Sequence, residues 1–352
     1  MKKTFLFLAV LCSIALLSCS KKDSNNETFT VGHGVFVLNE GNYTNSNASL
    51  SFYDFTKDTV ENDLFYRVND APLGDVAQSL TSYNHSLYVV VNNSKDIYKL
   101  DEKTIEYKAK LGGFYSPRYM LPVGNGKAYV SDLAASGLWV VDLGNFSHSK
   151  FIETGKAVEC MVKVGDEVFA ANWSKQYVTA ENNTIQVVNC VNDEKVAEIV
   201  VAHEPNDMAV DKYNHIWVSC SGGYMPPCDP AIICVDPVTR QVIRRFDLPE
   251  GCYPSRIVTD KDGENVYYMN GGYSTLKVYK MPADATELPA TPFIADAARS
   301  FYNLIVNPEN GDIYVTDVKD YIQSGELLRY SSEGALLGTY HVGIIPSYML
   351  FN

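Results

Sequence analysis

The sequence predicts an all-β fold, a seven-bladed β-propeller whose ring is closed by the C-terminal strand completing blade one. Three observations predict it. A short strand-like segment recurs seven times, a second strand follows each copy, and the two ends of the chain supply complementary parts of one blade. We expect residues 29–352 to form this propeller as a single domain.

The N-terminal residues indicate an export signal that precedes the propeller. Met1-Lys2-Lys3 is basic, and the uncharged apolar run from Phe5 to Leu17 is shorter than the roughly 20 residues that span a bilayer. The following Leu16-Leu17-Ser18-Cys19 resembles a bacterial lipobox, which implies a signal peptide over 1–18 and a lipid on Cys19. The alternative is an ordinary signal peptide with an incidental cysteine. Residues 19–28 are then the lipid anchor and a flexible tether, because 20–28 contain no apolar side chain.

The recurring segment contains an apolar residue, an aromatic residue, a β-branched residue in most copies, and then Asn, Asp or Ser. Its aromatic positions are Phe36, Tyr88, Tyr129, Phe169, Trp217, Tyr267 and Tyr314. Successive aromatics are 52, 41, 40, 48, 50 and 47 residues apart. A period of about 40–50 residues is typical of a four-stranded propeller blade.

The residues that flank each copy repeat as well. A second strand follows every copy after a polar loop, as in Leu138-Trp139-Val140-Val141-Asp142. A shorter apolar strand precedes most copies and often begins with proline, as in Tyr253-Pro254-Ser255-Arg256-Ile257-Val258. Turns of the Asp-Gly and Asn-Gly kind, at Asp262-Gly263 and Asn310-Gly311, join the two.

The first blade lacks this leading strand, since Val35 follows the tether almost at once. The C-terminal residues Ile345–Asn352 have the same proline-led apolar pattern with nothing after it. We therefore expect the last strand to complete blade one, which removes exposed sheet edges from the ring. Six or eight blades are the alternatives, and the seven copies favour seven.

The composition excludes some partners. The net charge is -13 and Lys and Arg do not cluster, which argues against nucleic acid as a partner. Export permits disulfides, and six cysteines lie within the propeller: Cys160, Cys190, Cys220, Cys228, Cys234 and Cys252. Their spacing matches no zinc ribbon or finger. We expect one or two disulfides within 220–252, with buried free thiols as the alternative.

A ligand site is expected on one face of the ring, which we call the loop face. The loops that lead into the innermost strands and those that join the second and third strands meet there, around the central channel. Tyr, Trp, Asn and Arg in these loops suit recognition of a bulky polar ligand, although Asn at a strand end is more often a turn residue. The candidate ligand-binding residues are Glu40, Asn42, Tyr43, Asn93, Tyr115, Arg118, Asp132, Glu159, Asn172, Trp173, Asn206, Asp207, Tyr224, Ser255, Arg256, Tyr273, Tyr302, Asn303 and Tyr348.

Two resemblances bear on function. Ile313-Tyr314-Val315-Thr316-Asp317 is similar to the repeat of the YVTN or YncE-like propellers. The junction at residues 18–23 and the opening Val35–Asn42 look like exported propellers of gut Bacteroidetes. One branch of that group captures vitamin B12 and caps a TonB-dependent cobalamin transporter. This resemblance implies a surface-exposed lipoprotein of the outer membrane that binds cobalamin, with amides and Arg118 or Arg256 meeting its amide and phosphate groups, and passes it to such a transporter.

No catalytic residue is assigned, and we expect a binding protein rather than an enzyme. The six His form no His-Glu-x-x-His pair, and no Gly-x-Ser-x-Gly or phosphate-binding loop occurs. One enzyme hypothesis is a calcium-dependent, lactonase-like hydrolase that gathers oxygen ligands from Glu40, Glu159, Asp207 and Asn303. A propeller that binds a glycan and a scaffold that binds only proteins are also consistent with the sequence.

Overall fold

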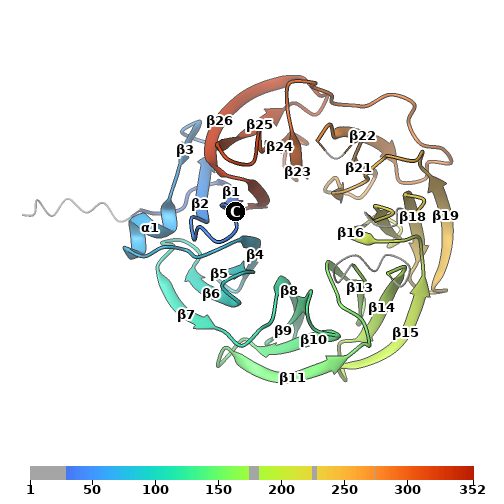
Figure 1. The fold of residues 1–352 in the computed structure, drawn as a ribbon, viewed down its shortest axis with the longest axis horizontal. Coiled ribbons are helices and arrows are strands. Elements are labelled where there is room, and N and C mark those ends of the chain that lie inside the picture. Colours follow the sequence, from blue (N-terminus) through green and yellow to red (C-terminus); the bar gives the residue numbers. More distant parts are fainter. Residues whose placement is uncertain (1–28, 174–181, 224–227, 273) are drawn as a thin grey trace, which may run out of the picture.

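The structure, a computed structural model, describes residues 29–173, 182–223, 228–272 and 274–352. Seven β-sheets surround a central axis like the blades of a propeller, which confirms the predicted fold class (Figure 1). The predicted signal peptide, Cys19 and the tether lie outside the described residues. Among the described residues, no helix has the length and apolar character needed to cross a bilayer.

The blades follow one another around the ring in chain order, and within each blade the strands run from the channel outward. Blade 1 comprises β27 (Pro346–Phe351), β1 (Gly34–Asn39), β2 (Ser49–Asp54) and β3 (Thr59–Glu61); blade 2, β4 (Ala77–Tyr83), β5 (Ser86–Val91), β6 (Asp96–Asp101) and β7 (Tyr107–Leu111); blade 3, β8 (Pro117–Gly124), β9 (Lys127–Asp132), β10 (Gly137–Asp142) and β11 (Ser147–Glu153); blade 4, β12 (Met161–Val164), β13 (Glu167–Ala171), β14 (Thr184–Asn189) and β15 (Glu194–Val200). Blade 5 comprises β16 (Pro205–Val210), β17 (Ile216–Cys220), β18 (Ala231–Asp236) and β19 (Gln241–Asp247); blade 6, β20 (Ile257–Thr259), β21 (Asn265–Asn270) and β22 (Lys277–Pro282); blade 7, β23 (Phe301–Val306), β24 (Ile313–Asp317), β25 (Ser324–Tyr330) and β26 (Leu336–Ile344).

The core lies between neighbouring blades. The seven aromatic residues of the repeat all lie on the second strands and are almost fully buried. Seven apolar clusters result, one at each interface between blades; for example, Phe169 of blade 4 shares a cluster with Val218 of blade 5. Since β strands present alternate residues to opposite faces, each blade contributes to the cluster on either side of it.

The ring closes through β27, as the sequence predicts. β27 pairs antiparallel with β1, with Leu38 opposite Tyr348 and Phe36 opposite Leu350. Met349 joins Val37 of blade 1 in the cluster that also contains Tyr314 of blade 7. The first blade is therefore built from both ends of the propeller domain, and the C-terminus lies near the channel (Figure 1).

Blade 6 differs from the four-stranded prediction, because its described residues form a sheet of three strands. Among the described residues beyond β22, the ladder to the sheet is reduced to an isolated bridge between Val278 and Ile294. Pro282, Pro289 and Pro292 lie in or beside this stretch. Proline has no backbone N–H to donate to a sheet, which accounts for the missing ladder.

A short helix, α1 (Leu64–Asn69), lies between blades 1 and 2 and was not expected from the sequence. It buries Leu64 and Phe65 in the apolar cluster between those blades. This insertion explains why the separation from Phe36 to Tyr88 is the longest in the repeat.

The predicted disulfides are wrong: in the described part of the chain, none of the six cysteines forms one. Cys220 lies opposite Ala231, and Cys234 lies opposite Trp217 on the adjacent strand. Cys220 packs in the cluster between blades 4 and 5, and Cys234 in the cluster between blades 5 and 6. The two thiols therefore point to opposite faces of one sheet. Cys160 and Cys190 are also buried, which matches the alternative of buried thiols.

Candidate functional site

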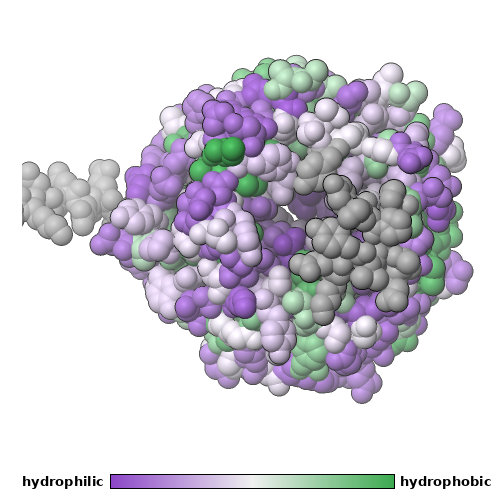
Figure 2. Space-filling model, viewed as in Figure 1, coloured by the Kyte–Doolittle hydropathy of each residue, from purple (hydrophilic) through white to green (hydrophobic). Residues whose placement is uncertain are grey.

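A cavity of about 240 Å³ lies at the loop-face end of the central channel, and we call it the loop-face cavity. Figure 2 shows a hollow with hydrophilic residues near the centre of the ring. Every one of the seven blades contributes to its lining. The lining residues are Glu40, Gln78, Arg118, Tyr119, Glu159, Trp173, Asn206, Asp207, Tyr253, Ser255, Arg256, Leu276, Tyr302, Asn303, Tyr321 and Ser347.

The first fixed charge pair in the cavity joins blades 3 and 4. Arg118 lies at the start of β8, and its Nε and Nη2 donate to the Glu159 carboxylate at 2.8 and 2.7 Å. Its Nη1 donates to Oε1 of Gln78 in blade 2 at 2.5 Å. The Arg118 and Glu159 side chains are only 16% and 6% exposed. Burial acts to lower the pKa of Arg118, but the Glu159 carboxylate raises it above its ordinary value, so this arginine keeps its charge.

The second pair joins blades 5 and 6. Nη1 of Arg256 lies 3.1 Å from Oδ2 of Asp207, near the start of β16. Asp207 also accepts the backbone N–H groups of Met208 and Ile257, each at 3.0 Å. Burial raises the pKa of Asp207, and Arg256 and these N–H groups oppose that rise. The Arg256 guanidinium lies 5.4 Å from the ring centroid of Tyr348, deeper in the channel.

Glu40 follows β1 and is a third carboxyl group in the lining of the cavity. Burial raises its pKa from 4.5 to about 7, while Arg118 and the hydroxyls of Ser347 and Tyr302 partly oppose the rise. Glu40 therefore exchanges its proton near neutral pH. With Glu40 neutral, the cavity holds two arginines and two carboxylates in pairs, so its charges balance.

Aromatic rings surround these charges. The Arg118 guanidinium lies 5.8 Å from the Trp173 ring centroid. The Tyr302 and Tyr321 rings meet edge to face, with centroids 6.0 Å apart. Flat apolar faces beside fixed polar groups can stack a ring system and hydrogen-bond its substituents.

Ten of the predicted ligand-binding residues line this cavity: Glu40, Arg118, Glu159, Trp173, Asn206, Asp207, Ser255, Arg256, Tyr302 and Asn303. Tyr348 lines a different cavity at the other end of the channel. Tyr43 and Tyr115 lie in loops of the same face, with 71% and 59% of their surface exposed. Tyr224 and Tyr273 lie outside the described residues.

The other four predicted residues do not line the cavity, and their amides or carboxylates are used within the fold. Asp132 accepts the backbone N–H groups of Tyr115 and Ser116 at 2.8 and 2.9 Å. Asn42 donates to the backbone O of Tyr321 at 2.7 Å, and Asn93 donates to Asp75.

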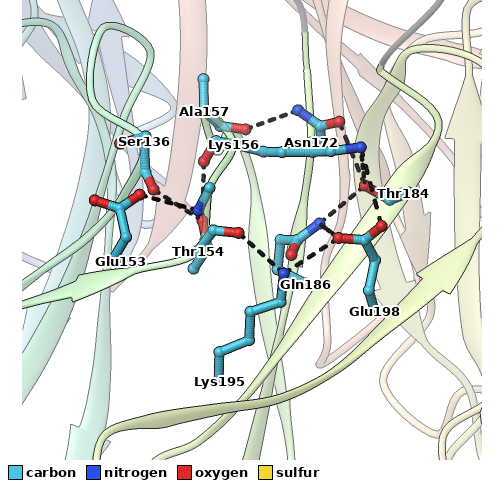
Figure 3. Close-up of polar contacts among 11 residues, drawn as sticks. Ser136, Glu153, Thr154, Lys156, Ala157, Asn172, Thr184, Gln186, Lys195 and Glu198 are labelled. Atoms are coloured by element: carbon cyan, nitrogen blue, oxygen red, sulfur yellow. Dashed lines mark hydrogen bonds and ion pairs between the residues drawn. The ribbon is translucent and has the colours of Figure 1, made fainter.

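Asn172 belongs to a separate polar network between blades 3 and 4 (Figure 3). Its Nδ2 donates to the backbone O of Ala157 at 3.1 Å, and Thr184 donates to its Oδ1. Lys195, on β15 of blade 4, donates to the backbone O of Thr154, which follows β11 of blade 3, at 2.9 Å. Asn172 thus holds the segment that connects blades 3 and 4 against β14 of blade 4.

The sequence analysis missed Tyr119, Tyr253, Leu276 and Tyr321, whereas Gln78 and Ser347 lie where the chain enters the innermost strands, the region in which the site was expected. A signal for the charge pairs was present. Arg118 and Glu159 are 41 residues apart, and Asp207 and Arg256 are 49 apart, so each pair is separated by about one blade. Residues at matching positions of adjacent innermost strands are neighbours in a propeller. Opposite charges one repeat apart therefore indicate a pair.

The predicted calcium ligands do not assemble into one group. Glu40, Glu159 and Asp207 do not bring their oxygens within 4.8 Å of one another. Glu159 and Asp207 each face an arginine, which a calcium ion would have to displace. The chemistry of this donor set does not favour calcium.

Comparisons with known proteins agree with the fold. The profile of a family described as "Domain of unknown function (DUF5074)" matches residues 33–352. No curated protein matches the chain in sequence. A quinonprotein alcohol dehydrogenase-like protein from Bacteroides thetaiotaomicron has a similar structure, with 16% identity and a TM-score of 0.70 over 92% of this chain and 79% of that one.

Two further solved structures carry names that suggest an activity. A putative 6-phosphogluconolactonase from Bacteroides fragilis is 13% identical, with a TM-score of 0.68 over 94% of this chain and 99% of that one. A periplasmic gluconolactonase from Pseudomonas aeruginosa is 14% identical, with a TM-score of 0.66 over 90% and 99%. At such identities, the likeness shows the fold alone.

Proposed function

The chain belongs to the DUF5074 family, a domain of unknown function, and since that description assigns no activity, we propose from the site itself that the protein is a ligand-binding propeller. The observation that carries this proposal is the loop-face cavity, to which all seven blades contribute. A site held by the whole ring is rigid and preformed, which favours recognition over chemistry that needs movement.

The charges of the cavity favour a neutral polar ligand. Arg118 and Arg256 already face Glu159 and Asp207, so neither arginine offers an unbalanced charge to an anion. Recognition then rests on two kinds of contact. The atoms of these ion pairs that face the cavity would form hydrogen bonds with the ligand, and Trp173 and Tyr302 would stack against it. Such a lining suits amide or hydroxyl groups carried on a broad ring system.

Cobalamin is the ligand that we propose first. Its corrin ring is broad and flat, and its rim bears many amides. The cavity, at about 240 Å³, is smaller than the roughly 300–1,000 Å³ of sites that enclose drug-sized ligands. One edge of cobalamin would enter, and the rest would lie over the loops, where Tyr43 and Tyr115 are exposed.

Delivery to a partner completes the proposal. The lipobox-like residues Leu16–Cys19 support a lipid anchor in the outer membrane, and the likeness of Val35–Asn42 to exported capture propellers supports a cell-surface position. The proposed partner is a TonB-dependent transporter that receives the ligand from the loop face.

A titration of residues 29–352 with cyanocobalamin, followed by calorimetry in the presence of a chelator, tests the proposal. We expect one-to-one binding. Tyr43→Ala on the loop face should weaken it about 2- to 10-fold, the worth of one aromatic contact. Tyr213→Ala is the matched control, because Tyr213 is 47% exposed on the turn between β16 and β17, at the opposite face. No binding at high micromolar concentration would exclude cobalamin, and equal effects of the two variants would exclude the loop face.

A second candidate, a lactonase-like hydrolase, has one specific observation in its favour. Glu40 has a pKa of about 7, as a general acid or base at neutral pH requires. Hydrolysis of small aldonolactones that disappears in Glu40→Gln would favour this function. Cobalamin binding without lactone turnover would exclude it.

A further inference from the structure

A second group of chemically active side chains lies far from the loop-face cavity, between blades 5 and 6. Asp211 follows β16, His215 immediately precedes β17, and Cys234 lies on β18. A carboxylate oxygen, a ring nitrogen and the sulfur of these residues all lie within 4.8 Å of one another. Since β16 begins at the loop face, the turn that carries Asp211 and His215 lies at the opposite face. The proposed ligand site therefore does not involve this group.

The spacing of two of these atoms fits a metal ion better than a hydrogen bond. Nδ1 of His215 lies 3.7 Å from Oδ2 of Asp211, which is too long for a hydrogen bond. Nδ1 is buried and has no hydrogen-bond partner among the described residues. Ligand bonds of about 2.0–2.2 Å in a tetrahedral zinc site place two N or O ligands roughly 3.3–3.6 Å apart.

We propose that Asp211, His215 and Cys234 bind a divalent cation of the zinc type. Carboxylate oxygen, imidazole nitrogen and thiolate sulfur form the mixed donor set that zinc accepts, whereas calcium takes oxygen ligands alone. Three protein ligands leave the fourth tetrahedral position for water. The ion would bring together the turn between β16 and β17 and the strand β18, all within blade 5.

Neighbouring groups already orient these ligands. Oδ1 of Asp211 accepts the backbone N–H groups of Tyr213 and His215 at 2.8 and 2.9 Å, which fixes the carboxylate within its turn. Oδ2, which lies 3.7 Å from Nδ1 of the His215 imidazole, accepts the Trp217 indole N–H at 2.9 Å. Supporting hydrogen bonds of this kind are a regular part of metal sites in proteins.

The charges and the access route are also compatible with a divalent ion. The Asp211 carboxylate and the Cys234 thiolate together neutralise two positive charges, and His215 binds as neutral imidazole. Nη1 of Arg244 lies 3.8 Å from Sγ of Cys234 and donates to the backbone O of Ala283 at 3.1 Å. The arginine therefore lies beside the Cys234 sulfur without taking a ligand position. The His215 side chain is 24% exposed, whereas its Nδ1 and the Asp211 side chain are buried, so an ion would have to enter past the imidazole.

Titration of the purified protein with Co²⁺, and then with Zn²⁺ in competition, tests the proposal. A Co²⁺ ion in this site should show the absorption bands of tetrahedral coordination and a thiolate-to-metal charge-transfer band, at one equivalent. Zn²⁺ should abolish both. Cys234→Ser should remove the charge-transfer band, and His215→Gln should raise the dissociation constant at least about tenfold.

Cys252→Ser is the matched control, because Cys252 is a partly exposed thiol outside the cluster. It should leave the spectrum unchanged. If Cys234→Ser does not fold, His215→Gln at the partly exposed position still decides the outcome. Absence of a tetrahedral spectrum at one equivalent overturns the proposal. So does a spectrum lost with Cys252 rather than with Cys234 or His215.

Discussion

The two ends of the central channel differ in size and in chemistry. The cavity at the opposite end, here the opposite-face cavity, measures about 410 Å³ and is the larger. It is lined mainly by apolar residues of the innermost strands, such as Val258, Val306 and Leu350. The loop-face cavity takes most of its lining from the starts of those strands and from the loops, and is rich in charge and aromatic rings. Tyr119, Asp207 and Arg256 border both and divide them.

This difference shows that the volume of a cavity alone does not identify the ligand-binding site. Positions in the middle of an innermost strand must fit the packing of adjacent blades, so they are apolar or small. Positions at the strand starts and in the loops are free of that requirement and carry polar groups. The larger cavity follows from the geometry of a ring, and the smaller one holds the groups that can recognise a ligand.

Removal of residues 345–352 should have the largest effect, because β27 lines both cavities. Ser347 faces the loop-face cavity, and Met349 and Leu350 face the other. The deletion leaves β1 without its partner and opens the ring, so we expect unfolding or aggregation, measured as soluble yield and thermal melting. Removal of Asn352 alone, which leaves β27 in place and loses its two hydrogen bonds to Gly32 and Gly34, is the control and should have a much smaller effect. A soluble deletion variant with an unchanged melting temperature would contradict the closure.

Asp207→Ala should have the next largest effect, since it leaves Arg256 buried without its carboxylate. We expect a loss of about 3–5 kcal/mol in the free energy of unfolding, measured with urea. Val306→Ala in the opposite-face cavity should cost only about 1.5 kcal/mol, for two methyl groups. A double variant, Asp207→Ala with Arg256→Met, should recover much of the loss. Equal losses of unfolding free energy in Asp207→Ala and Val306→Ala would contradict the difference between the two cavities.

The sequence predicted the fold well because a propeller repeats one packing problem seven times. Each copy of the segment, from Phe36 to Tyr314, buries its aromatic residue against the next blade, so the period itself carries the architecture. The prediction was incomplete at blade 6, where prolines replace a regular outer strand. It was wrong for the cysteines, because the face on which Cys220 or Cys234 points depends on strand register.

The site was predicted less completely, for a physical reason. Topology brings the strand starts together, which placed Arg118, Arg256 and Glu40 in the same cavity. Whether an Asn or Asp turns toward the channel or back to its own turn depends on local hydrogen bonds, as at Asp132 and Asn172. Single positions give no sign of that choice.

The smallest effect that we predict concerns Glu40. This carboxyl group makes the stability contributed by the loop-face cavity depend on pH. In the folded protein its pKa is about 7, against 4.5 as the ordinary value, so the folded state holds this proton more tightly than the unfolded state. The contribution of the protonated Glu40 carboxyl to the free energy of unfolding is fully present below pH 4.5. It is lost as the pH rises through 7. Glu40→Gln cannot lose a proton, so its stability relative to wild type should rise by about 1–3 kcal/mol between about pH 4.5 and pH 8. Urea unfolding at both pH values measures this, with exposed Glu287→Gln as the control. Parallel pH profiles for wild type and Glu40→Gln would mean that the carboxyl is hydrated and charged, and a charged Glu40 would turn the loop-face cavity from a site for neutral ligands into one that favours cations.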